Sequence, residues 1–188
     1  MRYIARKLSG KVLFSLKQNP AVFLNGPRQS GKTTLVRALA HKDYPAEYVS
    51  FDNVTNMEAA YAAPESFLRW RKGPVIIDEV QLVPELFRAL KVLVDEARLG
   101  NNKESNGRFL LTGSANIMIL PKLSDSLVGR MSVMTLYPFS ACEVFSTRGD
   151  FPERLFSADF SGLKNEQTLR EAIESATFPE VSAKPVLK

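Results

Sequence analysis

Residues 26–33 bring two glycines, a lysine and a threonine together at a spacing that suits a bound phosphate. The stretch GPRQSGKT matches G-x-x-x-x-G-K-[ST]. Backbone N–H groups of such a turn surround phosphate oxygens, and the next helix directs its positive N-terminus at them. Lys32 would reach the β and γ phosphates, and Thr33 would offer its hydroxyl to Mg²⁺. The expected nucleotide-binding residues are Gly26, Pro27, Arg28, Gln29, Ser30, Gly31, Lys32, Thr33 and Thr34.

Two acidic residues follow the apolar segment that begins at Pro74, in PVIIDEVQ. Asp78 could hold Mg²⁺ through water. Glu79, just past the strand end, could orient and deprotonate a water that attacks the γ phosphate. The alternative is a pair of solvated acids at a strand terminus. With the phosphate loop earlier in the chain, we favour hydrolysis, with Glu79 as the base.

Polar residues also follow the apolar segment in LLTGSAN, residues 110–116. Thr112, Ser114 and Asn116 would lie at the carboxyl edge of a parallel sheet, where ligands of open α/β sheets bind. One of them could hydrogen-bond the γ phosphate or the attacking water. Helix capping is the alternative role for Ser and Asn here. We keep Thr112 and Ser114 as catalytic candidates and rank Asn116 below them.

Arg130, in SLVGRM, lies between a predicted helix and a predicted strand. We expect it near the nucleotide edge, where a guanidinium could stabilise charge that develops on the transferred phosphoryl group. An ordinary surface arginine is the alternative.

The segment FLRWRKGP, 67–74, interleaves aromatic and basic residues, a composition suited to nucleic acid. We favour a simpler interpretation, a helix end with cations at its negative pole and Trp70 half-buried. His41 also ends a predicted helix and receives no catalytic role. NKES, 102–105, lacks the acidic fourth residue of a guanine-reading motif, so ATP is favoured over GTP.

A parallel sheet would bring these residues together. Apolar runs alternate with helical patterns, as parallel strands with crossover helices require. The predicted strands are residues 21–25, 47–51, 74–78, 108–113 and 132–137. The predicted helices are residues 31–41, 64–71, 84–98 and 115–128, preceded by an N-terminal helix that carries Ile4, Leu8, Val12, Leu13 and Leu16 and stops at Asn19-Pro20.

The length and composition of the chain limit the classes of protein to which it can belong. The 188 residues, 45% of them hydrophobic, suffice for one substantial core. A net charge of +5 permits acidic partners without demanding them. No run of eighteen apolar residues occurs, so we expect no membrane span and a cytoplasmic protein. The single cysteine, Cys142, fits a reducing compartment and is expected in the core.

Taken together, the chain resembles the AAA+ ATPases of bacteria and archaea that carry a C-terminal domain of unknown function. The resemblance runs from about Arg6 to Glu180 and rests on five stretches in the family's order: GPRQSGKTTL, IIDEVQ, LLTGSAN, SLVGRM and LYPFSACEV. It implies an α/β P-loop NTPase fold, a five-stranded parallel sheet in the order 5-1-4-3-2 sandwiched by helices. It also implies that Thr112 or Ser114 is the first sensor, and that Arg130 acts on the γ phosphate of its own site or a neighbour's.

The resemblance weakens toward the C-terminus. In ATFPEV, 176–181, Ala176 and Thr177 stand where family members usually have two glycines, so a nucleotide contact by that backbone is in doubt. We expect an ATPase core over residues 1–138 and, over 139–188, a helical extension or the start of a lid. The family's second domain should begin about where this sequence stops, so we expect a truncated protein.

The main hypothesis is therefore an Mg²⁺-dependent ATPase that binds ATP and ADP and couples the nucleotide state to a partner. Two alternatives remain open: a nucleotide-dependent switch with negligible turnover, and a motor or loader that works on nucleic acid. A homo-oligomer through Arg130 and a DNA or protein partner are compatible with the sequence. The segment from Tyr3 to Lys7 could contribute to the adenine site.

Overall fold

The computed structural model describes residues 3–100, 106–114, 129–144 and 156. The helix expected over 115–128, and Asn116 with it, lies outside the described residues. Most of the expected C-terminal extension, including Ala176 and Thr177, also lies outside them.

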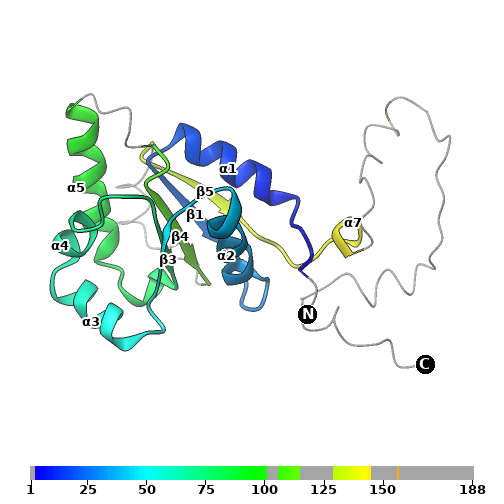
Figure 1. The fold of residues 1–188 in the computed structure, drawn as a ribbon, viewed down its shortest axis with the longest axis horizontal. Helices are drawn as coiled ribbons and strands as arrows, with labels where there is room; N and C mark the ends of the chain where they lie inside the picture. The colour runs from blue at the N-terminus through cyan, green and yellow to red at the C-terminus, as the bar shows by residue number, and fades with distance from the viewer. Residues whose placement is uncertain (1–2, 101–105, 115–128, 145–155, 157–188) are drawn as a thin grey trace.

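A parallel five-stranded sheet forms the centre of the structure (Figure 1). Its strands are β1 Ala21–Asn25, β2 Glu47–Ser50, β3 Val75–Asp78, β4 Phe109–Gly113 and β5 Met131–Thr135. They lie in the order β2-β3-β4-β1-β5, and every pair is parallel. Read from the other edge, this is the predicted order 5-1-4-3-2, so the predicted fold class is confirmed.

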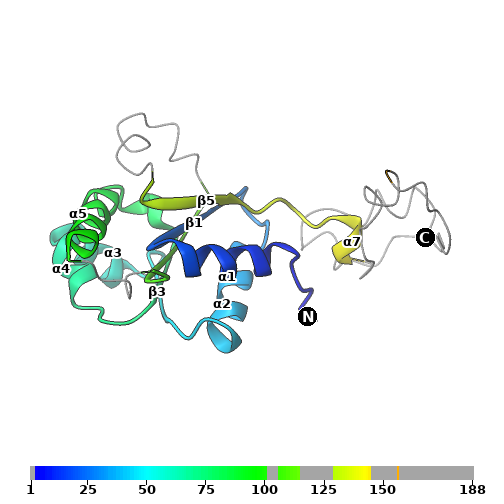
Figure 2. The same cartoon turned by 90° about the horizontal axis from the view of Figure 1, so that it is seen from above.

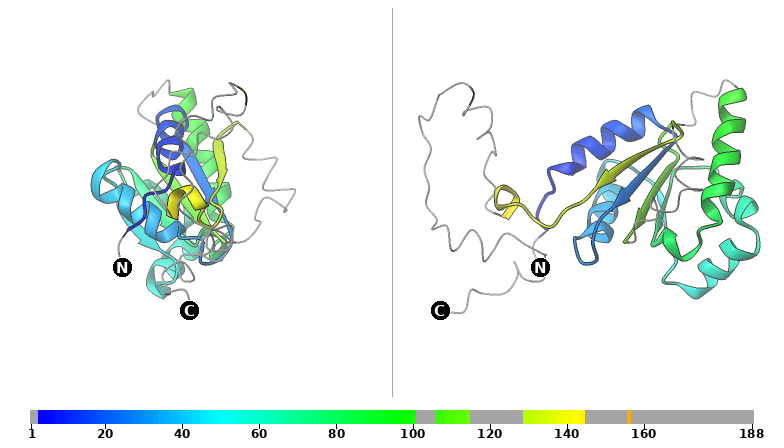
Figure 3. Two further views of the ribbon diagram at one scale, coloured as in Figure 1. Left: turned by 90° about the vertical axis from the view of Figure 1, so that its right-hand side faces the viewer. Right: turned by 180° about the vertical axis from the view of Figure 1, so that it is seen from behind.

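Helices cover both faces of the sheet (Figures 1 and 3). Alternate side chains of β1 belong to two different buried clusters. On one face, Val22 and Leu24 of β1 belong to a buried cluster with residues of α1 Leu8–Gln18 and α2 Lys32–Lys42. On the other face, Phe23 belongs to a cluster with residues of α3 Val54–Ala62, α4 Pro64–Arg69 and α5 Leu86–Leu99. The central strands are mostly apolar because both of their faces are buried, and their polar residues, among them Asp78 and Thr112, lie at or near the carboxyl ends.

Two short elements complete the described fold. The 3-10 turn η1 Val80–Leu82 follows β3 directly, and α7 Ala141–Val144 lies beyond the carboxyl end of β5. Seen from above, α7 lies close to the segment that leads into α1 (Figure 2). The segment that leads into α1 and the segment that follows β5 thus lie at the same end of the sheet. This is the end where the phosphate loop follows β1.

Helix α3 was not predicted from the sequence. Asn53 caps it by accepting a hydrogen bond from the backbone N–H of Asn56 at 3.3 Å. Of its nine residues only Ala60 is buried, so the apolar periodicity that would have revealed it is nearly absent. The N-terminal helix begins at Leu8 and not near Ile4, because Arg6 leaves the helical path to enter the contacts described below.

Two predicted burials are wrong. Trp70 is 83% exposed, not half-buried, because α4 ends at Arg69 and the apolar contacts of this segment are made by Phe67 and Leu68. Cys142 is a free thiol of intermediate exposure and not a core residue. Among the described residues, no helix combines the length and the apolar character that crossing a bilayer requires.

Candidate functional site

The phosphate loop runs from the end of β1 to the start of α2 and has no room for side chains at its tightest point. Gly26 packs so closely against the residue after β5 that a Cβ atom there would lie 2.3 Å from the carbonyl oxygen of Leu136. Gly31, with φ of 91°, occupies the left-handed region and caps α2. The backbone N–H groups of the first turn of α2 therefore lie directly after the loop, without a side-chain cap, in the usual arrangement for anion binding.

Lys32 is buried within this loop. Its ammonium donates hydrogen bonds to the carbonyl oxygens of Gly26, at 2.9 Å, and Pro27, at 2.8 Å. Burial lowers the pKa of Lys32, although the nearby carboxylates of Glu79 and Asp78 oppose the shift. The ammonium group thus bonds to the backbone of its own loop. A phosphate oxygen could take the place of these carbonyl oxygens as its hydrogen-bond acceptor.

Asp78 collects hydroxyl groups from three neighbouring elements. Thr33, on α2, and Tyr48, on β2, donate to its Oδ2 at 2.7 and 2.6 Å. Thr112, on β4, donates to its Oδ1. Asp78 is only 1% exposed and Thr112 is fully buried. Asp78 is therefore not a solvated acid at a strand terminus.

Glu79 follows at once and adopts left-handed backbone geometry, with φ of 60°. For a residue with a Cβ atom this conformation is uncommon and is often found at functional sites. The Nε2 of Gln81 donates a hydrogen bond to the Glu79 carboxylate and another, of 3.2 Å, to Oγ of Ser114. The backbone N–H of Ser114 donates back to Oε1 of Gln81 at 3.3 Å. Gln81 therefore joins two of the predicted site residues.

Sequence reasoning assigned no role to Gln81 or Tyr48. Gln81 lies in the stretch IIDEVQ, and its position two residues after Glu79 was the signal available in the sequence. The 3-10 turn that follows Glu79 and contains Gln81 is a feature of the structure. Tyr48 carried no signal, because only the pairing of β2 with β3 brings it beside Asp78. Burial and the hydrogen bond to Asp78 raise the pKa of Tyr48 to about 12, so its hydroxyl keeps its proton.

Arg130 is not where the sequence placed it. In the β1–β5 register Ala21 pairs with Met131 and Asn25 with Thr135. Arg130 therefore precedes β5 at the amino edge, on the order of 15 Å of strand away from the phosphate loop. Its guanidinium contacts the carboxylate of Asp95 at 2.5 and 3.0 Å. The expectation that it lies near the edge of its own nucleotide site is thus wrong.

The donor set fits a hard cation only in part. Among the described residues no group of three or more His, Cys, Asp or Glu side chains could hold a metal. The 2.7 Å contact between Thr33 and Asp78 offers one hydroxyl and one carboxylate, the ligand types that Mg²⁺ takes in phosphate sites. Mg²⁺ usually keeps several waters and uses substrate phosphates for its remaining ligands. These residues therefore fit a metal that arrives with a nucleotide.

Known proteins resemble this chain in sequence and in structure. It is 36% identical over 146 residues to uncharacterized proteins of Mycobacterium bovis and Mycobacterium tuberculosis, and the match covers 77% of this chain. The chain spans only 31% of the length of these relatives.

Among solved structures, a Walker-type ATPase of Pyrococcus abyssi is similar, with a TM-score of 0.53 and 14% identity, over 94% of this chain and 65% of that one. Cdc6p of Pyrobaculum aerophilum gives 0.48 and 16%, over 77% of this chain and 49% of that one. The family model for the AAA domain matches residues 18–145, more than half of the chain. The chain therefore belongs to the AAA domain family, as an ATPase-type P-loop module.

Proposed function

We propose that the protein is an Mg²⁺-dependent ATPase whose site is the carboxyl edge of the sheet. The observation that carries the proposal is the hydrogen bond of 2.7 Å between Thr33 and Asp78. It joins the phosphate loop to the acidic strand end, so the groups that would bind phosphate and those that would activate water belong to one cluster. Two motifs that lie 45 residues apart along the chain act as one site.

The residues of the cluster divide the work by their chemistry. Lys32 and the backbone N–H groups of Gly26, Arg28, Gln29, Ser30 and Gly31 would hold the phosphates. Pro27, which has no N–H, would contribute to the shape of the loop, and Thr33 and Thr34 lie at the start of α2. Thr33 and Asp78 would hold Mg²⁺, which when bound neutralises charge that develops on the phosphate oxygens. Tyr48 and Thr112 would fix the Asp78 carboxylate through their hydrogen bonds.

Glu79 would act as the base. Its carboxylate lies just past the end of β3 and would accept the proton of the attacking water. Gln81 holds this carboxylate and also contacts Ser114, so Ser114 would sense the γ phosphate from the neighbouring strand end.

The test is the replacement Glu79→Gln. We expect ATP binding to persist while turnover falls by about 10² to 10⁴, the usual span for a general base. Glu58→Gln, an exposed change on α3, is the matched control and should leave turnover unchanged. Equal turnover in Glu79→Gln and wild type would remove Glu79 from the mechanism. Tightly retained ADP with negligible turnover in the wild type would support the nucleotide-dependent switch instead.

A second proposal concerns assembly. Because Arg130 lies at the amino edge, it could act only on the site of a neighbouring copy in a homo-oligomer. Specific ATPase activity should then rise with protein concentration, and Arg130→Ala should abolish that rise. Adding the inactive variant Glu79→Gln should restore activity to Arg130→Ala. In a mixed oligomer, the Glu79→Gln subunit supplies Arg130 to the site of the Arg130→Ala subunit, which still has Glu79. Activity that is independent of concentration and unaffected by Arg130→Ala would contradict a shared site.

A further inference from the structure

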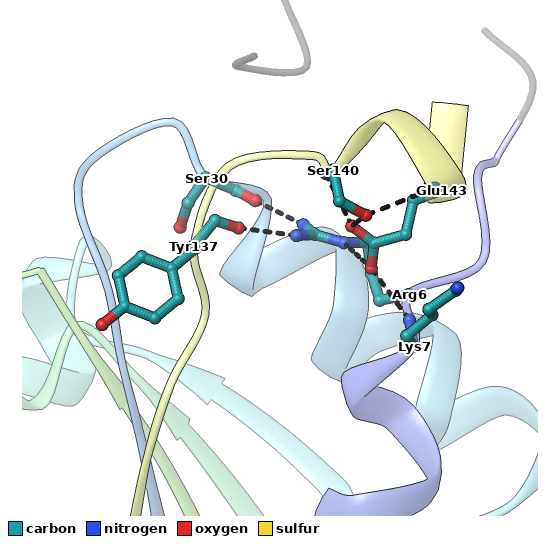
Figure 4. A network of polar contacts seen from close by, with 6 residues as sticks. All are labelled: Arg6, Lys7, Ser30, Tyr137, Ser140 and Glu143. Atoms are coloured by element: carbon teal, nitrogen blue, oxygen red, sulfur yellow. Dashed lines mark hydrogen bonds and ion pairs between the residues drawn. The ribbon is translucent and has the colours of Figure 1, made fainter. Parts of the chain in front are cut away.

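Arg6 is a buried cation whose side-chain nitrogens all have partners in distant parts of the chain (Figure 4). Its Nε donates to the carboxylate of Glu143 at 3.1 Å. One terminal nitrogen donates to the carbonyl oxygen of Ser30 at 2.7 Å, and the other donates to that of Tyr137 at 2.6 Å. The guanidinium also lies 4.5 Å from the ring centre of Phe139. Arg6 is 6% exposed, so these contacts are shielded from water.

The contact with Ser30 fixes one peptide unit of the phosphate loop. A peptide bond is planar and trans, so its C=O and N–H groups point in opposite directions. With the Ser30 carbonyl held on Arg6, the N–H of Gly31 must point away from Arg6. Gly31 caps α2, at the helix end whose amides bind anions. Arg6 therefore determines the orientation of an amide that would face the phosphates.

The contact with Glu143 links the same guanidinium to α7. Glu143 and Ser140 form a capping box, since Oγ and N of Ser140 donate to Glu143 at 3.1 and 3.0 Å and the N–H of Glu143 donates back at 3.3 Å. The backbone N–H of Lys7 donates to the same carboxylate at 2.9 Å. Burial alone would raise the pKa of Glu143, but these bonds and Arg6 outweigh it and lower the pKa. Glu143 thus stays charged beside Arg6.

We propose that Arg6 is a positioning residue for the nucleotide site and the link between that site and α7. It holds the Ser30–Gly31 peptide in the orientation that binds phosphate, and it does so only while Glu143 holds the guanidinium. Nucleotide binding and the docking of α7 then favour each other, since coupling between two sites is reciprocal. This inference rests on the proposed function, because it requires a phosphate in the loop.

The first measurement is nucleotide affinity. We expect Arg6→Gln and Arg6→Lys to bind Mg²⁺-ADP about tenfold to a hundredfold more weakly than wild type, because hydrogen bonds from a charged donor are lost. Thermal unfolding without nucleotide checks that each variant is folded. Arg6→Lys keeps a cation beside Glu143 and is the variant to interpret if Arg6→Gln does not fold.

Arg71 supplies a matched control in the same chain. Its Nε lies 3.2 Å from Glu47, it donates to the carbonyl oxygen of Phe67 at 2.5 Å, and its guanidinium lies 3.7 Å from the Phe67 ring. It therefore makes the same kinds of contact as Arg6, but at the amino edge and without touching the phosphate loop. Arg71→Lys should leave the affinity for Mg²⁺-ADP unchanged. An equal loss in Arg71→Lys would show a general effect of stability and would overturn the proposal.

The second measurement uses Cys142, the single cysteine of the chain, which lies in α7 next to Glu143. Saturating Mg²⁺-ADP should slow alkylation of its thiol about fivefold in the wild type, within the usual range of coupling between sites. Arg6→Gln and Glu143→Gln should remove this dependence, and Arg71→Lys should keep it. A role of Arg6 in stability alone would not make thiol reactivity depend on nucleotide.

The outcomes separate this inference from the proposed function. A wild type that binds no nucleotide would contradict the proposed function itself. A wild type that binds Mg²⁺-ADP, with Arg6 variants of equal affinity and equal thiol protection, would leave the proposed function standing and overturn the role of Arg6.

Discussion

The two edges of the sheet carry polar residues of the same kinds in opposite surroundings. At the carboxyl edge Asp78 is buried among three hydroxyl donors and lies near a buried lysine. At the amino edge Arg130 pairs with Asp95, and these side chains are 26% and 35% exposed. Exposed pairs contribute little to stability, whereas buried polar groups are costly unless every partner is present. Asp78 and Lys32 are buried with their hydrogen-bond partners in place, and we interpret this cluster as a preformed site for a ligand. The amino edge shows no such cluster among its described residues.

The largest expected effect on stability comes from Asp78→Ala. Removing the carboxylate leaves the hydroxyl of fully buried Thr112 without its acceptor, which costs about 1–3 kcal/mol. It also removes the hydrogen bonds of half-buried Thr33 and Tyr48, each worth about 1 kcal/mol. We therefore expect a loss of roughly 3 kcal/mol or more in the free energy of unfolding, measured with urea in the absence of nucleotide. Asp95→Ala is the amino-edge counterpart and should cost much less. Equal losses of unfolding free energy in Asp78→Ala and Asp95→Ala would show that the two edges of the sheet do not differ in this respect.

Gln81→Ala should have the next largest effect. It removes the amide that joins Glu79 to Ser114, which should cost about 1 kcal/mol in the free energy of unfolding. We also expect turnover to fall about tenfold, because the base loses the group that orients it. Gln18→Ala, at the exposed end of α1, is the control and should change neither quantity. Turnover equal to wild type in Gln81→Ala would show that Gln81 is structural only.

The dependence of stability on pH tests the buried ion pair between Arg6 and Glu143. The pKa of Glu143 lies below its ordinary value of 4.5 in the folded protein. Because the pKa is lower in the folded protein, ionised Glu143 stabilises the folded state at pH values above 4.5. This contribution is lost as the pH falls from 4.5 through the lower pKa of the folded protein. We expect the difference in unfolding free energy between wild type and Glu143→Gln to shrink over that window. A difference that stays constant between neutral and strongly acidic pH would show that Glu143 carries no such linkage.

Trp70→Ala should have the smallest effect. The side chain is 83% exposed, so we expect a change within about 0.5 kcal/mol in the free energy of unfolding. The two neighbouring arginines form ion pairs, since Arg69 contacts Glu96 at 2.8 Å and Arg71 contacts Glu47. We therefore expect no stimulation of ATPase activity by DNA through this segment. Stimulation that fades steeply with salt and disappears in Trp70→Ala would instead support the nucleic-acid motor.

Much of the fold was predictable from local pattern. All five strands were predicted within two residues of their ends, because buried parallel strands are short apolar runs between turn signals. Helix α3 was missed because it buries almost nothing and so has no apolar stripe. Trp70 was placed half-buried on its residue type alone, while its exposure follows from where α4 ends.

The phosphate loop and the pair Asp78-Glu79 could be predicted from the sequence because each depends on residue types at fixed spacing in one short stretch. The family could be predicted because five such stretches follow one another in the family's order. Which residues share a site depends on the folded chain. The pairing of β2 with β3 brings Tyr48 to Asp78, and the register of β5 moves Arg130 to the opposite edge. Arg6 reaches Ser30 and Glu143 across 24 and 137 residues of sequence. Contacts of that range depend on how strands pair and helices pack, and no local pattern encodes them.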